Sequence, residues 1–414
     1  MRFDTVIIGG GLAGLVCALE LQKRGQDCAV VSAGHSTLHF NCGSFGLLSS
    51  LEDGTPVDEP IEAFERLSPE HPYSVIGAQR AAELAGNIPE VFASYSIPLK
   101  GCAERNGLAI SPLGGLYPTA FVTGDSELLQ DKPKEQKAII VNFEGYHDFN
   151  SQFIAGELMH LGMTVRSEFY RSPRIALLRK SPSEMRAVAI GRLMTDPQER
   201  NNFIEGVKAL LKDEDLVVLP AVFGLKDAGA AMEVKAGIPV KTVLVGTMPP
   251  SVPGSRIEYL LTKAFTGAGG TLLQGDRAVK AEMEAGSIKS IRTEKLGDCL
   301  LEARNFVLAT GSYVSMGLWA TQNSVNETLF GLDTDFIPDR GQWCDEDFFA
   351  DQKYLSFGVC TDSELRPSKD GVTIPNLRAI GSLLGGCNPL SMGCGAGVAI
   401  ITALAAAESI SKEG

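Results

Sequence analysis

The chain has 414 residues, too many for one compact hydrophobic core, so two domains or one domain with a large insertion are expected. Its 50 acidic and 37 basic side chains give a net charge of -13, which repels phosphate backbones and anionic lipid surfaces. These numbers exclude nucleic acid from the expected partners. No run reaches the roughly 18 apolar residues of a membrane span, so a cytoplasmic protein without a direct span is expected.

The beginning of the chain predicts a strand, a helix and a second strand. Apolar runs at residues 5–8 and 28–31 predict the strands, and helical spacing predicts a helix over 12–24 that ends at Gly25. The unit has the length of a βαβ crossover, roughly 30 residues. It therefore indicates a parallel sheet.

A second alternation of strands and helices begins at residue 137, after a less regular stretch with one predicted helix at 79–93. Its expected strands are 138–143, 163–168, 216–219 and 240–245, and its expected helices are 150–160, 183–193, 198–212 and 228–235. A proline-rich turn at 248–253 ends it. Beyond that turn we expect a helix at 255–268, strands at 271–274, 287–293, 306–309 and 377–380, and a final helix at 395–412.

These elements predict an α/β fold. We expect a doubly wound, Rossmann-type domain formed by residues 1–69 and 251–414, with a second α/β domain inserted at 70–250. The domain is expected to be discontinuous because the glycine motifs described next occur only at the two ends of the chain. The insertion is expected to bind a substrate or a partner.

Residues 9–14 form the pattern G-x-G-x-x-G between the first predicted strand and helix, the context that the dinucleotide fingerprint requires. Gly9 permits the tight turn, Gly11 lets a pyrophosphate approach the backbone, and Gly14 lets helix and strand pack closely. Leu12 and Ala13 open the helix, whose free N–H groups and dipole favour phosphate. The alternative is a flexible glycine-rich loop.

The end of the second strand departs from the fingerprint. An acidic residue that holds the ribose hydroxyls is expected roughly 20 residues after the motif. This chain has Ser32 there, followed by Ala33 and Gly34. A serine accepts one hydrogen bond but cannot make a bidentate carboxylate contact, which weakens the expectation of an adenosine half.

Two later segments favour flavin over nicotinamide. An apolar strand ends in Ala309, Thr310 and Gly311, a turn at which the backbone can approach a dinucleotide. Near the C-terminus, Gly381 and Ser382 precede Gly393, Cys394 and Gly395, which open the last helix. A helix N-terminus at the flavin pyrimidine edge stabilises the charge that forms on reduction. Tight packing of the last helix is the alternative reading of this run.

With these motifs in this order, the chain resembles the flavoprotein family that includes fumarate reductase flavoprotein subunits and glycerol-3-phosphate dehydrogenases. The resemblance to the B subunit of bacterial anaerobic glycerol-3-phosphate dehydrogenases spans essentially the whole chain. It rests on residues 1–6, 38–44, 249–254, 357–362, 365–367 and 379–386. The segment 38–44 adds Asn41, Cys42 and Gly43 to the expected cofactor site.

The resemblance implies an enzyme of three subunits: this chain, a catalytic flavoprotein subunit, which is a separate chain, and a membrane-associated iron–sulfur subunit. Such an enzyme oxidises sn-glycerol 3-phosphate to dihydroxyacetone phosphate and passes electrons to quinone during anaerobic growth. The chain would then lie on the inner membrane through a partner protein. The family to which the resemblance points is usually described as binding FMN, whereas the glycine motif favours FAD, so both flavins stay open.

Histidine and cysteine positions bear on the role of this chain. Oxidation of an alcohol usually needs a base, most often histidine, and no histidine follows His160. His39, Arg340 and Arg366 are weak catalytic candidates. The nine cysteines form no C-x-x-C pair, so no iron–sulfur cluster or other metal site is expected. We therefore expect a relay of electrons between subunits; a self-sufficient flavin dehydrogenase of a small hydroxy compound and a scaffold with a degenerate flavin site are the alternatives.

Overall fold

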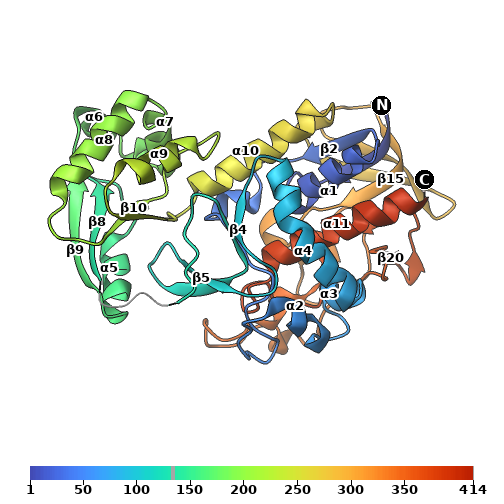
Figure 1. Cartoon of the computed structure of the whole chain (residues 1–414). Helices are drawn as coiled ribbons and strands as arrows, with labels where there is room; N and C mark the ends of the chain where they lie inside the picture. Colours follow the sequence, from blue (N-terminus) through green and yellow to red (C-terminus); the bar gives the residue numbers. More distant parts are fainter. Residues whose placement is uncertain (132–135, 414) are drawn as a thin grey trace.

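Two separate β-sheets, each with its own hydrophobic core, organise the chain (Figure 1). The computed structural model describes residues 1–131 and 136–413. The larger sheet is built from both ends of the chain, and the smaller one from its middle. The chain is thus an α/β protein in which residues far apart in sequence complete one sheet.

The larger sheet contains five parallel strands and an antiparallel hairpin. Strand β1 lies between β2 and β15, so it is buried on both faces, as the apolar run at its end requires. The strands, in spatial order, are β12 (Thr271–Gln274), β2 (Cys28–Ser32), β1 (Arg2–Ile8), β15 (Leu301–Leu308) and β22 (Leu377–Ala379), with the hairpin β14 (Ser287–Thr293) and β13 (Ala278–Glu284) also attached through β15.

Three helices surround this sheet and bury most of their apolar residues. Helix α1 (Leu12–Lys23) is buried from Ala13 to Leu21 and packs against α11 (Gly395–Glu413) and α10 (Val252–Gly267). In the described part of the chain, α11 alone is long and apolar enough to cross a membrane, over Gly395–Lys412. The folded chain buries 67% of that window, because α1 and α4 (Ala78–Ser94) pack against it.

The smaller sheet has four parallel strands in the order β11 (Lys241–Val245), β10 (Leu216–Pro220), β8 (Lys137–Phe143) and β9 (Thr164–Tyr170). Its helices are α5 (Ser151–His160), α6 (Pro173–Arg179), α7 (Ala187–Leu193), α8 (Pro197–Leu210) and α9 (Gly229–Gly237). The larger sheet does not continue into it, so the insertion is a separate layer of strands with its own core.

The core of the insertion begins later than the boundary expected at residue 70. It extends from Ala138 to Val252, whereas α3 (Pro72–Val75) and α4 contribute Tyr73, Leu84 and Phe92 to the core of the larger sheet. The helices that follow the expected boundary therefore share the core of the larger sheet. The cause is that α4 packs on α11, which lies some three hundred residues further along the chain.

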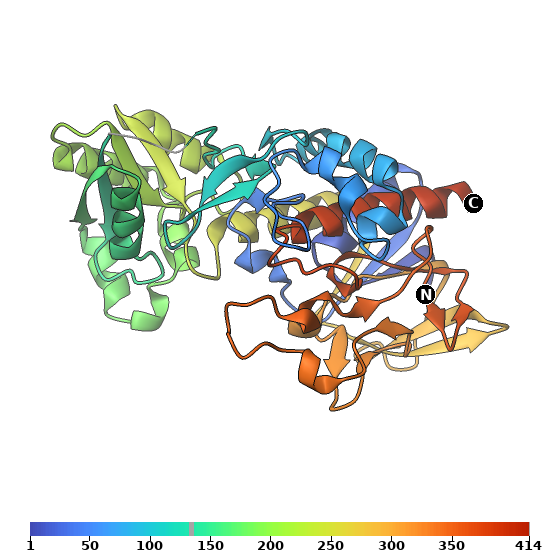
Figure 2. The same ribbon diagram turned by 90° about the horizontal axis from the view of Figure 1, so that it is seen from below.

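Short elements connect the two cores and form a lobe beside the larger sheet. Figure 1 shows β4 and β5 between the insertion and the rest of the molecule, and Figure 2 shows residues from about 312 to 375, in orange, gathered away from the insertion. These elements are η1 (Thr37–Phe40), β3 (Ser44–Phe45), α2 (Pro60–Ala63), η2 (Phe64–Arg66), β4 (Leu99–Gly101), β5 (Gly107–Ile110), β6 (Leu116–Thr119), β7 (Phe121–Thr123), η4 (Tyr313–Ser315), β16 (Leu318–Ala320), β17 (Val325–Glu327), β18 (Thr334–Asp335), η5 (Arg340–Gln342), η6 (Lys353–Ser356), β19 (Gly358–Val359), β20 (Ser368–Lys369), β21 (Val372–Thr373) and η7 (Gly381–Leu383). One more short element, η3 (Pro182–Glu184), lies inside the insertion, between α6 and α7.

A buried arginine connects the insertion to the larger domain. Arg256, in α10, donates to both carboxylate oxygens of Asp125 at 2.7 and 2.6 Å, and its other terminal nitrogen donates to the carbonyls of Phe223 and Gly224. Both side chains of the pair are 3% exposed. One guanidinium therefore pairs with Asp125, outside the core of the insertion, and reaches that core through two backbone carbonyls.

Candidate functional site

The glycine turn predicted from the sequence connects β1 to α1 at the C-terminal edge of the larger sheet. Gly9 has φ +120°, and a Cβ there would lie 2.1 Å from the carbonyl oxygen of Ala309. A Cβ on Gly14 would lie 1.9 Å from the carbonyl oxygen of Gly9. The backbone needs glycine at both positions, and the turn touches the end of β15 because β15 pairs with β1.

Gly11 differs from these two glycines because its surroundings are open. It is the N-cap of α1, no side chain caps the helix, and a Cβ there would meet only Ser36, at 3.8 Å. The N–H groups of the first helical turn, which includes Leu12 and Ala13, are thus left for a ligand. A helix N-terminus without a cap, beside open space, suits a phosphate group.

Ser32 ends β2 next to this turn, as expected, but its hydroxyl is already used. The Ser32 Oγ donates to the carbonyl of Gly34 at 3.0 Å, and a Cβ on Gly10 would lie 2.5 Å from the same oxygen. Ala33 follows it and is exposed. The Ser32 side chain therefore packs against the glycine turn at Gly10, and the end of β2 offers no carboxylate.

The Ala309–Gly311 turn and the Gly381–Ser382 turn lie side by side, because β22 pairs with β15. A Cβ on Gly311 would lie 3.5 Å from the Ser382 Oγ, and a Cβ on Gly381 would lie 2.9 Å from the Cβ of Ala13. The structure thus brings these turns and the start of α1 together at one edge of the sheet.

A cavity of about 420 Å³ opens beside these turns. It is lined by Ser312, Tyr313, Leu355, Ser382, Leu384, Cys387, Pro389, Gly395 and Val398. Nearby, the hydroxyls of Thr310 and Tyr313 are buried without a hydrogen-bond partner. Burial raises the pKa of Tyr313 to about 12, so this hydroxyl remains a donor at neutral pH. Two unpaired buried hydroxyls and an open helix N-terminus fit a polar, phosphate-bearing group such as a flavin nucleotide.

Gly393, Cys394 and Gly395 form the turn into α11 and contact the segment that follows β3. Gly393 has φ +60°, and a Cβ there would lie 2.2 Å from the Ser49 Oγ. The Ser49 N–H donates to the carbonyl of Met392 at 2.7 Å. The start of α11 is therefore held against a loop from the first fifty residues, and Gly395 borders the cavity.

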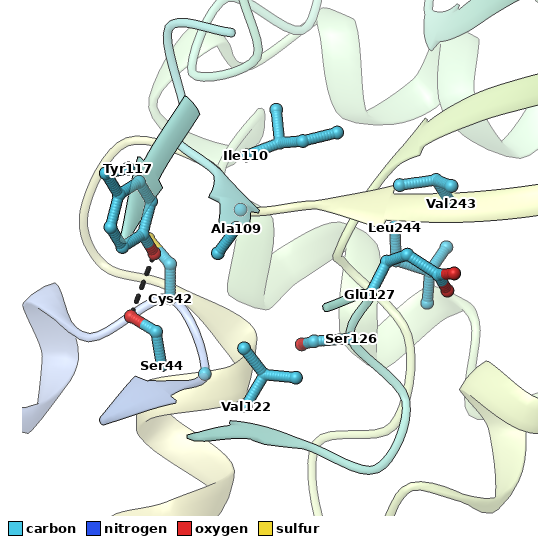
Figure 3. A pocket seen from close by; sticks show the side chains of 12 residues that line it. Cys42, Ser44, Ala109, Ile110, Tyr117, Val122, Ser126, Glu127, Val243 and Leu244 are labelled. Carbon is cyan, nitrogen blue, oxygen red and sulfur yellow. Dashed lines mark hydrogen bonds between the residues drawn. The ribbon is translucent and has the colours of Figure 1, made fainter. Parts of the chain in front are cut away.

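Asn41, Cys42 and Gly43 lie at a different opening. Cys42 and Gly43 line a cavity of about 310 Å³ together with β5, β6 and the end of β11 in the insertion. In Figure 3, Tyr117 and Ser44 meet across it through a hydrogen bond of 2.8 Å. The Asn41 side chain accepts the Gly43 N–H and donates to the Ser44 carbonyl, so it shapes the loop. This second cavity lies where the two cores meet.

The three weak catalytic candidates have partners on the protein itself. His39 Nε2 hydrogen-bonds to the Glu258 carboxylate. Arg340 is exposed and stacks its guanidinium 4.1 Å from the Trp343 ring. Arg366 donates to Asp362 at 2.8 Å. None of the three lines either cavity among the described residues.

Sequence reasoning missed His71, which lies fully buried against the C-terminal turn. His71 Nδ1 accepts the Tyr73 N–H at 3.1 Å, and its ring groups with the thiols of Cys387 and Cys394. Burial lowers the pKa of His71 to about 3, so its imidazole is neutral. No local pattern marks this residue, because the groups that it meets are more than three hundred residues away.

Comparison with known proteins gives the class of the molecule. Residues 4–398 match the family described as FAD binding domain. The chain therefore belongs to a class of FAD-binding proteins. The protein Sdh1 from Mycobacterium smegmatis, solved in complex with UQ1, covers 100% of this chain and 69% of its own at 11% identity and a TM-score of 0.44.

Full-length relatives give the particular family. A protein of Pectobacterium atrosepticum is 39% identical over 422 residues, which cover 100% of both chains, and one of Yersinia enterocolitica is 38% identical over 99% of this chain and 98% of its own. Both are named as the B subunit of an anaerobic glycerol-3-phosphate dehydrogenase. The chain belongs to this family of flavoprotein subunits, which confirms the resemblance found from the sequence.

Proposed function

We propose that this chain binds FAD and relays electrons between the other subunits of an anaerobic glycerol-3-phosphate dehydrogenase. One partner would be a catalytic flavoprotein subunit that oxidises sn-glycerol 3-phosphate to dihydroxyacetone phosphate. The other would be a membrane-associated iron–sulfur subunit that passes electrons to quinone and holds this chain on the cytoplasmic side of the inner membrane. Support comes from the relatives' names and from the FAD-binding family.

The observation that carries the cofactor is the helix α1, which begins without a cap beside two unpaired hydroxyls. The first turn of α1 would bind the phosphates through N–H groups. The hydroxyls of Thr310 and Tyr313 would orient the rest of the flavin by hydrogen bonds, and the turn at Gly381 would close against α1. The bound flavin would supply transfer of two electrons, one at a time or together.

The relay role rests on the histidines. A base that removes a proton from an alcohol needs a free lone pair, and the neutral imidazole of His71 uses its only lone pair to accept the Tyr73 N–H. His39 hydrogen-bonds through Nε2 to Glu258 and lines neither of the two cavities. Substrate oxidation would therefore take place on another subunit, with this chain accepting and returning electrons.

FMN remains the second cofactor candidate, because a specific residue favours it. The Ser32 hydroxyl donates to Gly34, so the end of β2 gives no carboxylate for the ribose of an adenosine half. Chromatography of the flavin released by heat from the purified protein separates the two. Release of FAD, and not of FMN, would support the cofactor proposed here.

The placement of the phosphates is tested at Gly11. A Cβ there meets only Ser36, at 3.8 Å, so the Gly11→Val variant should fold with an unchanged melting temperature in the flavin-free state. Its side chain would fill the space beside the first turn of α1, and flavin occupancy, read from visible absorbance per chain, should fall at least tenfold. Full occupancy in a folded variant would place the flavin elsewhere.

The relay role is tested by stopped-flow reduction under argon with excess glycerol 3-phosphate. The flavin-loaded chain alone should stay oxidised, and addition of the separate flavoprotein partner should bleach its flavin at the rate of complex turnover. Bleaching of the isolated chain at that rate would make it a self-sufficient dehydrogenase. A purified chain that carries no flavin at all would leave only a scaffold role.

A further inference from the structure

Three side chains with sulfur or imidazole atoms meet beside the larger of the two cavities, the one that Tyr313 and Ser382 line. They are His71, Cys387 and Cys394. Their reactive atoms all lie within 4.8 Å of one another. The side chains are 0%, 6% and 0% exposed. The two cysteines are seven residues apart in sequence, and His71 reaches them from the other end of the chain.

The backbone holds this cluster in place from three sides. His71 is the N-cap of α3, and a Cβ on Gly386 would lie 2.0 Å from the carbonyl oxygen of Glu70, so the turn that carries Cys387 packs directly on this cap. The Cys394 carbonyl accepts the Val398 N–H at 2.8 Å, which places Cys394 at the start of α11. Its thiol therefore sits at the N-terminus of a long helix.

The protonation state of His71 decides between a metal site and a thiol pair. Because Nδ1 accepts the Tyr73 N–H, the neutral imidazole carries its proton on Nε2. The Nε2 atom is buried without a hydrogen-bond partner. A metal ligand needs a lone pair at the atom that faces the ion. His71 instead presents an N–H donor to its surroundings, which suits sulfur as a hydrogen-bond acceptor and not a shared cation.

One of the two thiols borders the larger cavity. Cys387 lines it together with Tyr313, Ser382 and Gly395, two of which are expected flavin-site residues. Cys394 lies directly behind, fully buried. A flavin in the cavity, which exchanges two electrons, would therefore lie beside a pair of cysteines that can also exchange two electrons.

We propose that Cys387 and Cys394 form a redox-active dithiol–disulfide pair that exchanges electrons with the flavin; this rests on the flavin site proposed above. In the step, reduced flavin gives two electrons and two protons, the sulfur–sulfur bond breaks, and two S–H bonds form while the flavin becomes oxidised. In the reverse step the thiols lose two electrons and two protons to oxidised flavin. His71 is a positioning residue whose Nε2–H is offered to sulfur.

The surroundings of Cys394 fit the proton count of this step. Its hydrogen bond with Cys387 raises the pKa of the Cys394 thiol well above the usual range, and burial raises it further. The Cys394 thiol therefore keeps its proton at neutral pH. A pair that stores two electrons without gaining charge suits a site from which water is excluded.

The first measurement counts thiols in the intact, flavin-loaded chain. The sequence has nine cysteines. After anaerobic reduction, removal of the reductant and unfolding, a thiol reagent should find nine thiols; after oxidation by ferricyanide it should find two fewer. Peptide mass spectrometry should link Cys387 to Cys394. Because ferricyanide oxidises thiols without flavin, the same count on flavin-free protein separates failure of the pair from failure of the flavin site.

The second measurement counts electrons. Anaerobic titration with dithionite should consume four electrons per flavin, two for the flavin and two for the disulfide. The Cys387→Ala and Cys394→Ala variants should consume two electrons per bound flavin. The matched control Cys28→Ala, which also removes a buried thiol, should still consume four.

Three results would overturn the proposal. They are nine thiols in the oxidised wild-type chain, a wild-type titration that ends at two electrons in flavin-loaded protein, and a stoichiometric metal ion that the Cys394→Ala variant loses. A variant that fails to fold is replaced by Cys387→Ser, which keeps the volume of the side chain and removes the redox chemistry. Four electrons in this serine variant would also contradict the pair.

Discussion

Helix α1 of the larger domain begins differently from three helices of the insertion. In the insertion, α5, α6 and α8 begin at Asn150, Ser172 and Asp196, whose side chains accept N–H groups of the first helical turn. In the larger domain, α1 begins at Gly11, which has no side chain to do so. Helices and strands alternate in similar order in both cores, yet among these four helices only α1 leaves its N–H groups for a ligand. One residue at the start of a helix thus separates a binding edge from a structural one.

Arg256 connects the two cores, and the loss of its interactions should have the largest effect on stability. Replacement of Arg256 by methionine leaves the buried carboxylate of Asp125 without a cation, which should lower the free energy of unfolding by about 3–5 kcal/mol. Differential scanning calorimetry should show the melting of the two cores separating. The double variant Arg256→Met with Asp125→Leu should lose less than the single one, since it buries no unpaired charge. A cost below about 1 kcal/mol for the single variant would mean that the cores associate without this pair.

A glycine in each core compares their tolerance to one added methyl group. Gly14→Ala places a Cβ 1.9 Å from the Gly9 carbonyl oxygen and should destabilise the protein by about 1–3 kcal/mol, with loss of flavin. Gly156→Ala, in α5, meets nothing within 4 Å and should be neutral or stabilising by up to about 1 kcal/mol. Denaturant unfolding of both variants measures the difference. Equal effects would remove the argument for close helix–strand packing at the motif.

The caps of the insertion should contribute to stability and leave the flavin untouched. Asn150 accepts the N–H groups of Gln152 and Phe153 at 3.2 Å, so Asn150→Ala should cost about 1 kcal/mol. The exposed control Gln152→Ala should change stability by less than about 0.5 kcal/mol. Thermal melts and visible absorbance are measured on the same samples. A loss of flavin in Asn150→Ala would show that the caps of the insertion also affect flavin binding.

The comparison that depends on pH concerns Glu214, whose carboxylate bonds to Arg166 and accepts the Lys212 N–H. This arginine lowers the pKa of Glu214 from 4.5 to about 2. Because the folded pKa is the lower one, the stabilisation is present above pH 4.5 and is lost as the pH falls toward 2. Unfolding by urea across this window should give a steeper loss of stability for the wild type than for Glu214→Gln. Parallel slopes would contradict the assignment.

Local features of the site could be predicted from the sequence, and long-range ones could not. The turn at Gly9–Gly14 needs only its own strand and helix, so its pattern is complete within a few residues. The sequence pattern places helix α4 in the insertion, because nothing in its own residues shows that its apolar face packs on α11. His71 was missed for the same reason. Short or half-exposed elements such as α6 and β13 lack a run of apolar residues long enough to predict them.

The way in which the two ends of the chain share one sheet also determines the order in which the protein can fold during synthesis. Strands β8 to β11 are complete once about 250 residues have left the ribosome, so the insertion can close early. The larger sheet must wait for β15 and β22, which follow the insertion in the chain. At roughly 5–20 residues per second, the apolar faces of β1 and α1 stay without their partners for many seconds. We therefore expect nascent chains to be held by chaperones at β1 and β2 until β15 has been made.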